Sequence, residues 1–172
     1  MVALFAMSSG AIQLNEVCSF AYQLQNVKIK ELAGAKFDLY VIDYSSDGGA
    51  AGEYRVPDIA QIKSGISPAG SKVVLSYISI GEAEDYRFYW QAGWTAGNPA
   101  WLDQENPQWK GNFKVKYWDP AWQAIIFSWL DRIIAQGFDG CYMDIIDAYI
   151  YYEERGRATA KQEMVGFVKA IA

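Results

Sequence analysis

The chain has 172 residues, of which 52% are apolar and 20% are charged, so it suits one folded domain with a substantial core. Fifteen basic and twenty acidic residues give a net charge of −5, which excludes the basic surface that nucleic-acid phosphates require. The chain contains no histidine, which excludes His-dependent nucleophiles, His-ligated metals and imidazole bases. Acid–base chemistry in this protein therefore depends on carboxylates, tyrosine or lysine.

The N-terminal segment, residues 1–16, begins with an apolar stretch that ends in small residues. It lacks the basic residues of a secretory signal and is shorter than a membrane span. We expect it to be the remnant of a trimmed signal, a disordered segment or a product of where the chain was cut. A signal remnant implies a secreted or periplasmic protein, and the folded domain is then expected to cover residues 17–172, with no membrane span.

Two strand–helix units are predicted in the first part of the chain. An alternating strand at residues 19–25 precedes a short helix that closes at Gly34. A dense apolar strand at residues 37–44 precedes a helix that starts at Pro57. The apolar residues of this second helix that share helical spacing are Ile59, Ile62 and Ile66.

Two further units follow. The almost continuous apolar run at residues 71–80 is typical of a strand buried on both faces of a parallel sheet. A long loop is predicted for residues 81–117, and the next helix has Asp119 as its N-cap and ends at Gly137. The apolar stripe of this helix comprises Trp122, Ile125, Ile126, Trp129, Ile133 and Ile134. The last unit pairs a strand at residues 139–146 with a C-terminal helix.

Buried strands that alternate with helices predict an α/β architecture, in which ligands bind at the C-terminal ends of the strands. The residues that follow the predicted strands are acidic, namely Asp43, Glu82, Asp144 and Asp147. A closed (β/α)8 barrel usually needs about 250 residues, so this chain supplies about half of one. An open four-stranded sheet would leave two apolar edges exposed.

Four blocks of sequence occur in order within residues 18–165: LYVIDYSSDG, VVLSYISIGEAEDYRFYW, WLDQENPQWKGNFKVKYWDPAWQ and GFDGCYMDIIDAY. Together they resemble glycoside hydrolase family 114, the endo-α-1,4-polygalactosaminidase family. The resemblance implies a (β/α)8 TIM-barrel fold, of which this chain supplies about four β-α units. It also implies hydrolysis of α-1,4-linked galactosamine or N-acetylgalactosamine polymers by paired carboxylates. One of the proposed catalytic acids of the family falls on Asp144, and the other, a glutamate on a later strand, is expected beyond Ala172.

Asp144 is thus the predicted catalytic residue. Side chains alternate along a strand, so Tyr142 and Asp144 share one face while Met143 and Ile145 share the other. If the second pair faces the outer helices, Asp144 points toward the barrel axis and its mouth. The alternative is a strand-end aspartate that caps the following turn. We assign Asp139, at the N-terminal end of the strand, to turn geometry with Gly137 and Gly140.

Substrate binding is predicted for a set of acidic and aromatic residues, namely Asp43, Tyr44, Tyr77, Glu82, Trp118, Tyr142 and Asp147. The alternative for Glu82 is a solvated acidic loop, because Glu84 and Asp85 lie beside it. Its position directly after a buried strand favours Glu82 over these neighbours as a binding or supporting carboxylate. Asp43 and Asp147 would also serve as turn caps. The seven Trp and twelve Tyr include clusters that suit stacking on sugar rings, although each aromatic residue would equally fill a core.

No metal site and no cofactor are predicted, because the sequence has no Cys or His ligand cluster and no EF-hand spacing. Cys18 and Cys141 are expected to be small core residues, with a disulfide between them as the alternative.

Two alternatives to a polysaccharide hydrolase remain at this point. The first is a non-catalytic carbohydrate-binding protein that uses the same acidic and aromatic groove. The second is an inactive, truncated barrel fragment that self-associates through its open sheet edges.

Overall fold

The structure, a computed structural model, describes residues 2–4 and 14–172. Its packing separates the chain into two units. The first unit comprises the described residues of Val2–Ile78 together with Leu130–Tyr142, and the second comprises Ser79–Trp129 together with Met143–Ala172. Most of the expectation for residues 1–16 lies outside the described residues.

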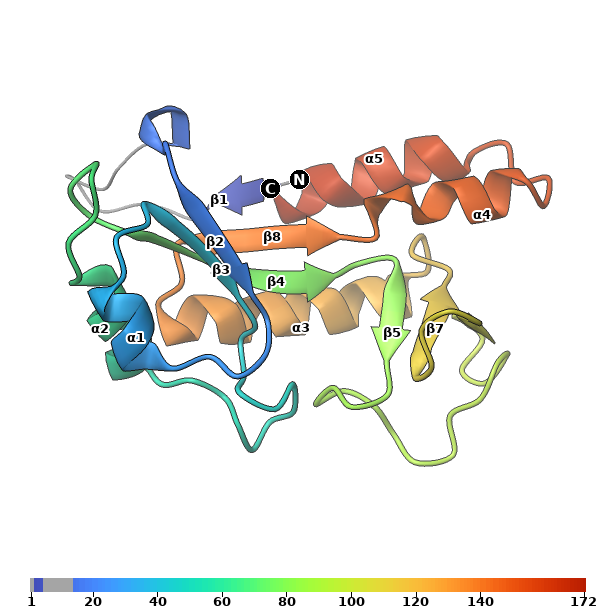
Figure 1. The fold of residues 1–172 in the computed structure, drawn as a ribbon. Helices are drawn as coiled ribbons and strands as arrows, with labels where there is room; N and C mark the ends of the chain where they lie inside the picture. The colour runs from blue at the N-terminus through green and yellow to red at the C-terminus, as the bar shows by residue number, and fades with distance from the viewer. Residues whose placement is uncertain (1, 5–13) are drawn as a thin grey trace. The chain divides into compact units, whose positions relative to one another are not determined.

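The first unit is built on a five-stranded sheet (Figure 1). Its strands, in spatial order, are β1 (Val2–Leu4), β8 (Gly140–Asp144), β4 (Val73–Ser79), β3 (Leu39–Ile42) and β2 (Phe20–Gln23). Strands β2, β3, β4 and β8 form the parallel sheet that the alternation of strands and helices predicts. Strand β1 pairs antiparallel with β8 and therefore covers one of the two edges that were expected to be exposed.

Burial differs among the parallel strands, because most of β8 is buried whereas β2 has no buried residue. Every residue of β3 and β4 is buried, as expected for a strand with both faces covered. An apolar cluster on the sheet comprises Leu39, Val41, Val73, Leu75 and Tyr77, against which Val17, Leu24 and Tyr142 pack. The apolar runs of the sequence therefore form the core of this unit.

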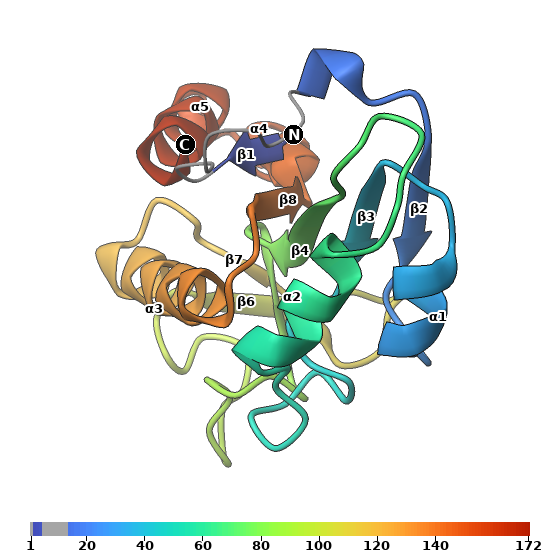
Figure 2. The same cartoon turned by 90° about the vertical axis from the view of Figure 1, so that its left-hand side faces the viewer.

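Helices α1 (Ile29–Gly34) and α2 (Val56–Lys63) pack side by side (Figure 2). The start of α2 is capped, because the Asp58 carboxylate accepts the backbone N–H of Arg55 at 2.8 Å. The buried residues of α2 are Ile59 and Ile62. The prediction that Ile66 continues this stripe is wrong: the helix ends before it, and Ile66 is 79% exposed.

The second unit contains a three-stranded antiparallel sheet in the order β5-β7-β6. Its strands are β5 (Glu82–Glu84), β6 (Leu102–Glu105) and β7 (Asn112–Val115). The prediction of a continuous loop over residues 81–117 is therefore wrong. Strands this short carry no clear periodicity, and they depend on cross-strand pairing between residues that are distant in sequence. Four tryptophans in successive ring contacts accompany this sheet, namely Trp90, Trp94, Trp101 and Trp122.

The long helix α3 (Pro120–Gln136) begins at its predicted N-cap, since the Asp119 carboxylate accepts the N–H of Ala121 at 2.8 Å. Its fully buried residues are Trp122, Ile126, Trp129 and Ile133. Ile134 was expected on the same stripe, but it is 51% exposed because one further residue turns the side chain away from the buried face.

Two further helices complete the second unit, α4 (Tyr149–Glu153) and α5 (Ala160–Ile171), and they pack against each other. Among the described residues, no helix has the length and apolar character needed to cross a membrane.

Candidate active site

Two buried glutamates lie on β5, directly after strand β4, in the second unit. The residues Glu82 and Glu84 are 2% and 3% exposed. Side chains two residues apart point to the same side of a strand, so both carboxylates lie on one side of β5. Burial of two acidic groups requires that each has partners.

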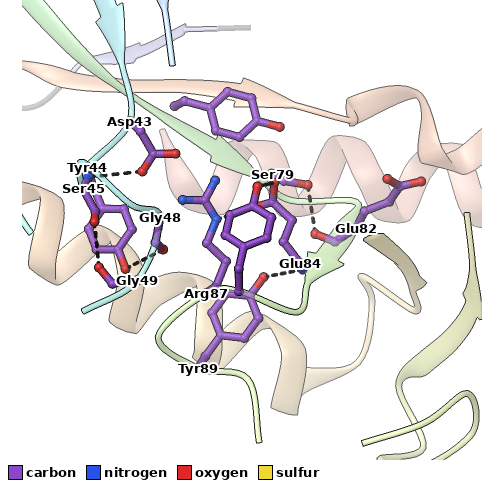
Figure 3. A network of polar contacts seen from close by, with 12 residues as sticks. Asp43, Tyr44, Ser45, Gly48, Gly49, Ser79, Glu82, Glu84, Arg87 and Tyr89 are labelled. Carbon is purple, nitrogen blue, oxygen red and sulfur yellow. Dashed lines mark hydrogen bonds and ion pairs between the residues drawn. The ribbon is translucent and has the colours of Figure 1, made fainter. Parts of the chain in front are cut away.

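The partners of Glu82 come from elsewhere in this unit. Its Oε1 accepts a hydrogen bond from the side-chain amide of Asn106 at 2.9 Å and lies 3.2 Å from the ammonium of Lys114. The Lys114 ammonium also lies 4.8 Å from the centroid of the Tyr151 ring. The backbone carbonyl of Glu82 accepts the Ser79 hydroxyl at 2.9 Å (Figure 3). Glu82 is thus the oriented, buried carboxylate that its place after a strand suggests.

Glu84 is also buried, contrary to the expectation of a solvated loop residue. Its Oε2 lies 2.5 Å from Nε of Arg87, and its Oε1 accepts the Tyr86 hydroxyl at 2.5 Å. The Arg87 guanidinium stacks on Trp129 at 4.6 Å from the ring centroid. An arginine three residues after an acid, among aromatic residues, is the signal in the sequence that would have found this pair. Asp85, by contrast, is exposed as expected.

The backbone of β5 is fixed in the same region. The N–H of Glu84 donates to the Tyr89 hydroxyl at 3.0 Å (Figure 3). Burial, together with the nearby Glu84 charge, raises the pKa of Tyr89 well above its usual value. Tyr89 therefore stays a neutral phenol that supports the strand.

Asp144 is the last residue of β8 and is partly exposed. Along this strand Cys141 and Met143 are buried whereas Tyr142 and Asp144 are partly exposed, which is the alternation that a pleated strand predicts. The backbone carbonyl of Asp144 accepts the N–H of Ile80 at 3.2 Å. Within the second unit, the end of β8 therefore lies beside the chain that leads into β5.

Asp147 lies a short distance beyond, in the 3₁₀ helix η2 (Ile146–Ala148), and is exposed. Asp147 therefore lies just after the end of the strand, with its side chain exposed to solvent. This position is compatible with both predicted roles, ligand binding and turn capping.

Asp43 follows β3 in the first unit and is 5% exposed. Its Oδ1 accepts the N–H of Ser45 at 3.2 Å, which is the turn-capping contact considered for this residue. The Ser45 hydroxyl lies 2.7 Å from Asp47 Oδ1. It also lies 2.7 Å from the Gly49 carbonyl (Figure 3). Hydrogen bonds from Ser45 and from the Gly49 N–H lower the pKa of Asp47. The loop after β3 is therefore an ordered polar turn.

The predicted aromatic residues of the first unit are mostly internal. Tyr44 is completely buried, and its hydroxyl donates to the Gly48 carbonyl at 3.1 Å, so its ring offers no surface to a sugar (Figure 3). Tyr77 is 7% exposed and belongs to the apolar cluster on the sheet. Tyr142 is partly exposed at the rim of that cluster and meets Tyr22 edge to face.

Trp118, in the second unit, is partly exposed and lines a shallow pocket of about 370 Å³. The other residues that line this pocket are Gln123, Glu163, Gly166, Phe167 and Ala170. One side of the Trp118 ring is covered by the Arg157 guanidinium, which lies 3.7 Å from the centroid and forms an ion pair with Glu163.

Asp139 links two strands at their N-terminal ends, a role beyond the turn geometry with Gly137 and Gly140 that is predicted for it. Its Oδ2 accepts the N–H of Val74 at 2.9 Å, and its Oδ1 lies 2.5 Å from the Lys63 ammonium. This aspartate therefore fixes the register between β8 and β4.

Asp38 has the corresponding role before β3, and sequence reasoning missed it. One carboxylate oxygen accepts the N–H groups of Cys18 and Ser19, and the other accepts the N–H of Ala69. Burial by itself would raise the pKa of Asp38, but these hydrogen bonds together lower it. The signal is a repeated pattern, Phe-Asp followed five residues later by Asp, at residues 37–43 and 138–144.

The cysteines differ from the expectation of two core residues. Cys141 is buried in β8, but Cys18 is exposed because it precedes the outermost strand, β2. No disulfide joins them. Within the described part of the chain, no group of three or more Asp, Glu, Cys or His residues is arranged to hold a metal ion.

Parallel strands that alternate with helices and carry acidic residues at their C-terminal ends are typical of barrel-type α/β proteins. The chain belongs to glycoside-hydrolase family GH114, whose family model matches residues 4–172. It is 49% identical over 156 residues to an uncharacterized protein of Methanocaldococcus jannaschii and 44% identical over 158 residues to one of Thermotoga maritima. These matches cover 89% and 90% of this chain but 43% and 47% of the relatives, so the chain spans less than half of their length.

Two solved structures share the fold. The glycoside hydrolase domain of PelA from Pseudomonas aeruginosa has a TM-score of 0.65 at 17% identity, and the match covers 90% of this chain and 55% of that one. Aspergillus fumigatus Ega3, in a complex with galactosamine, has a TM-score of 0.60 at 16% identity, with 95% and 57% covered. The predicted fold class, a partial (β/α)8 TIM-barrel type, is confirmed.

Proposed function

We propose that the protein hydrolyses α-1,4-linked galactosamine or N-acetylgalactosamine polymers, with Asp144 as a catalytic carboxylate. The observation that carries this proposal is the position of Asp144, a partly exposed acid at the C-terminal end of a parallel strand. Membership of family GH114 supports the reaction class. The galactosamine bound to Ega3, a protein of the same fold, supports the substrate class.

The chemistry requires two carboxyl groups on either side of the glycosidic bond and passes through an oxocarbenium-like transition state. One carboxyl group protonates the leaving oxygen, while the other stays ionised as a nucleophile or a general base. We assign the ionised role to Asp144. Following the family resemblance, the second acid is proposed to be a glutamate on a strand later than β8.

The acidic character of the chain suits a substrate with positive charge, since the net charge is −5. Glu82 is proposed to bind or support the amino sugar near the reacting bond, because its carboxylate is already oriented by Asn106 and Lys114. A polymeric substrate of this kind also fits the proposed secreted or periplasmic location.

The test measures release of reducing ends from partly acetylated polygalactosamine by the 172-residue chain and by the longer Methanocaldococcus jannaschii relative. In whichever of the two proteins hydrolyses the polymer, replacement of the residue at this position (Asp144→Asn in the 172-residue chain) should lower the rate by about a hundredfold or more with the fold retained. Asp131→Asn, which changes an exposed acid on α3, is the matched control and should leave the rate unchanged. Full activity of Asp144→Asn would refute the assignment, whereas binding of galactosamine oligomers without turnover by both proteins would favour the carbohydrate-binding alternative.

One observation favours self-association as an additional property. Strand β2 is the last strand in the sheet order, and it carries two exposed aromatic residues, Phe20 at 66% and Tyr22 at 47%. An apolar edge strand of this kind is a template for pairing with a second copy. Light scattering after size-exclusion chromatography tests this proposal: a dimer that Phe20→Lys dissociates would support it, and a monomer at all concentrations would exclude it.

A further inference from the structure

The backbone turns sharply directly after Asp144. Ile145 has φ 57° and ψ 34°, in the left-handed region, and it is followed at once by the 3₁₀ helix η2. Among the described residues only Asn26 and Ile145 are non-glycine residues with positive φ. Asparagine tolerates this conformation, whereas for a β-branched isoleucine it is a costly outlier. The surrounding structure must therefore impose the turn at Ile145.

The turn at Ile145 is held by two backbone hydrogen bonds and by the close approach of Gly81. The N–H of Ile80 donates to the Asp144 carbonyl at 3.2 Å, and the Ile145 carbonyl accepts the N–H of Ala148 at 3.2 Å. Gly81 lies so close to the turn that a Cβ on it would be 2.2 Å from the Ile145 carbonyl oxygen and 2.6 Å from the Ala148 Cβ. Only glycine permits this approach of the two backbone segments.

We propose that the Gly81–Ile145 contact is a positioning device that fixes the Asp144 carboxylate against the acid-bearing segment that begins at Glu82. Glu82 is the residue next to Gly81, and Asp144 is the residue next to Ile145. One close backbone contact therefore sets the relative placement of two acidic residues of the second unit. Neither Gly81 nor Ile145 touches the reacting atoms in this proposal; both act through their neighbours.

A left-handed residue at this point has a clear mechanical effect. It ends β8 within one residue and redirects the chain into η2, so the Asp144 side chain leaves a rigid strand end rather than a loop. Preorganised carboxylates on rigid elements are what acid–base and nucleophilic catalysis require, and a displacement of about 1 Å can lower the rate about a hundredfold. The strain at Ile145 thus lies next to Asp144, the residue whose placement matters for the proposed function. The kinetic part of this inference rests on that proposed function.

The main test is Gly81→Ala, which adds one methyl group at the contact. The Ile145 carbonyl must move by about 1 Å to restore an ordinary contact, so we expect kcat to fall about tenfold to a hundredfold while KM changes little. The matched control is Gly34→Ala, which adds the same methyl group where no atom lies within 4 Å, and it should leave both constants unchanged. Circular dichroism and thermal unfolding establish that both variants are folded.

A second pair of variants keeps the inference testable if Gly81→Ala does not fold. Ile145→Asn accepts the left-handed conformation and should retain kcat within about threefold. Ile145→Pro fixes φ near −65°, excludes that conformation and should lower kcat by about tenfold or more. Retention of kcat by Ile145→Pro would overturn the inference.

A spectroscopic measurement separates this inference from the proposed function. The carboxyl carbon signals of Asp144 and Glu82 in the labelled 172-residue chain should shift in Gly81→Ala and stay in place in Gly34→Ala, whether or not the chain has hydrolase activity. Shifted signals, together with no hydrolysis by either the 172-residue chain or the longer Methanocaldococcus jannaschii relative, would support the positioning device and refute the proposed function. A folded Gly81→Ala variant with unmoved signals and unchanged kcat would refute the device.

Discussion

The Lys114 ammonium lies 3.2 Å from Oε1 of Glu82, and the two residues are direct partners in the β5–β7 ladder. The side chain of Glu82 is 3% exposed, whereas that of Lys114 is 22% exposed. A buried carboxylate thus depends on a cation that reaches it from the neighbouring strand. Opposite charges at directly paired positions also favour this register of the antiparallel sheet.

Removal of the Lys114 cation should destabilise the protein. Lys114→Met removes the cation beside the buried Glu82 carboxylate and keeps the hydrogen bond from the Asn106 amide, so we expect the free energy of unfolding to fall by about 1–3 kcal/mol. Urea denaturation measures the change, and Lys110→Met, at an exposed position, is the matched control. The double variant with Glu82→Gln should cost less than the sum of the two single variants. Equal effects of Lys114→Met and Lys110→Met would contradict the coupling.

The Asp38 carboxylate should make stability depend on acid pH. Its pKa is lowered in the folded protein, so its contribution is present above the unfolded pKa of about 3.9 and is lost as the pH falls through the folded pKa. The difference in unfolding free energy between the unmodified chain and Asp38→Asn should therefore shrink on acidification from pH 7 to below pH 3. Ser19→Ala removes one of the donors and should produce a smaller effect in the same direction. A difference that does not change with pH would argue against this role.

Tyr54 should have the opposite effect at alkaline pH. Burial, followed by the charges of Asp43, Asp58 and Asp47, raises the pKa of Tyr54 to about 12. A raised pKa gives stability that is present below the unfolded value of about 10 and is lost as the pH rises toward 12, because the unfolded chain ionises first. Tyr54→Phe removes this loss and should become more stable than the unmodified chain between pH 10 and pH 12.

The same substitution should have little effect at neutral pH. Within the described part of the chain the buried Tyr54 hydroxyl has no hydrogen-bond partner, so its removal should change the free energy of unfolding by less than about 1 kcal/mol at pH 7. Thermal unfolding of both proteins at the two pH values provides the comparison. A large loss of stability at pH 7 would show that the hydroxyl is bonded in solution.

Several elements of the fold could be predicted from local sequence. The strands at β3, β4 and β8 follow from runs of apolar residues, and the start of α3 follows from Asp119 and the proline after it. The boundaries were less accurate: Ile66 and Ile134 have helical spacing but lie outside the buried stripes. Periodicity shows which side of a helix or strand is apolar. It does not show how far along that side the neighbouring element covers the apolar residues.

For the acidic residues, the sequence predicts the position along the chain but not the interaction partners. Their placement after the strands follows from the order of strands and helices, since parallel strands collect their C-terminal ends at one edge. The partners of these acids do not follow from it. The run of acids at Glu82, Glu84 and Asp85 suits a solvated loop, yet Glu84 is buried with Arg87 and Tyr86 as its partners. Tyr44 lies beside an acid in sequence, yet its ring is internal.

The sequence by itself determined the α/β class, the absence of histidine chemistry and the presence of Asp144 at a strand end. These follow from the residue content and the spacing of apolar residues, which can be read along the chain without knowledge of distant contacts. Tertiary structure alone decided the antiparallel sheet at residues 82–115, the strand-linking roles of Asp38 and Asp139, and the left-handed turn at Ile145. Each of these depends on contacts between residues that are distant in the chain. Such contacts set hydrogen-bond partners, burial and backbone strain, and they leave no regular pattern in the sequence.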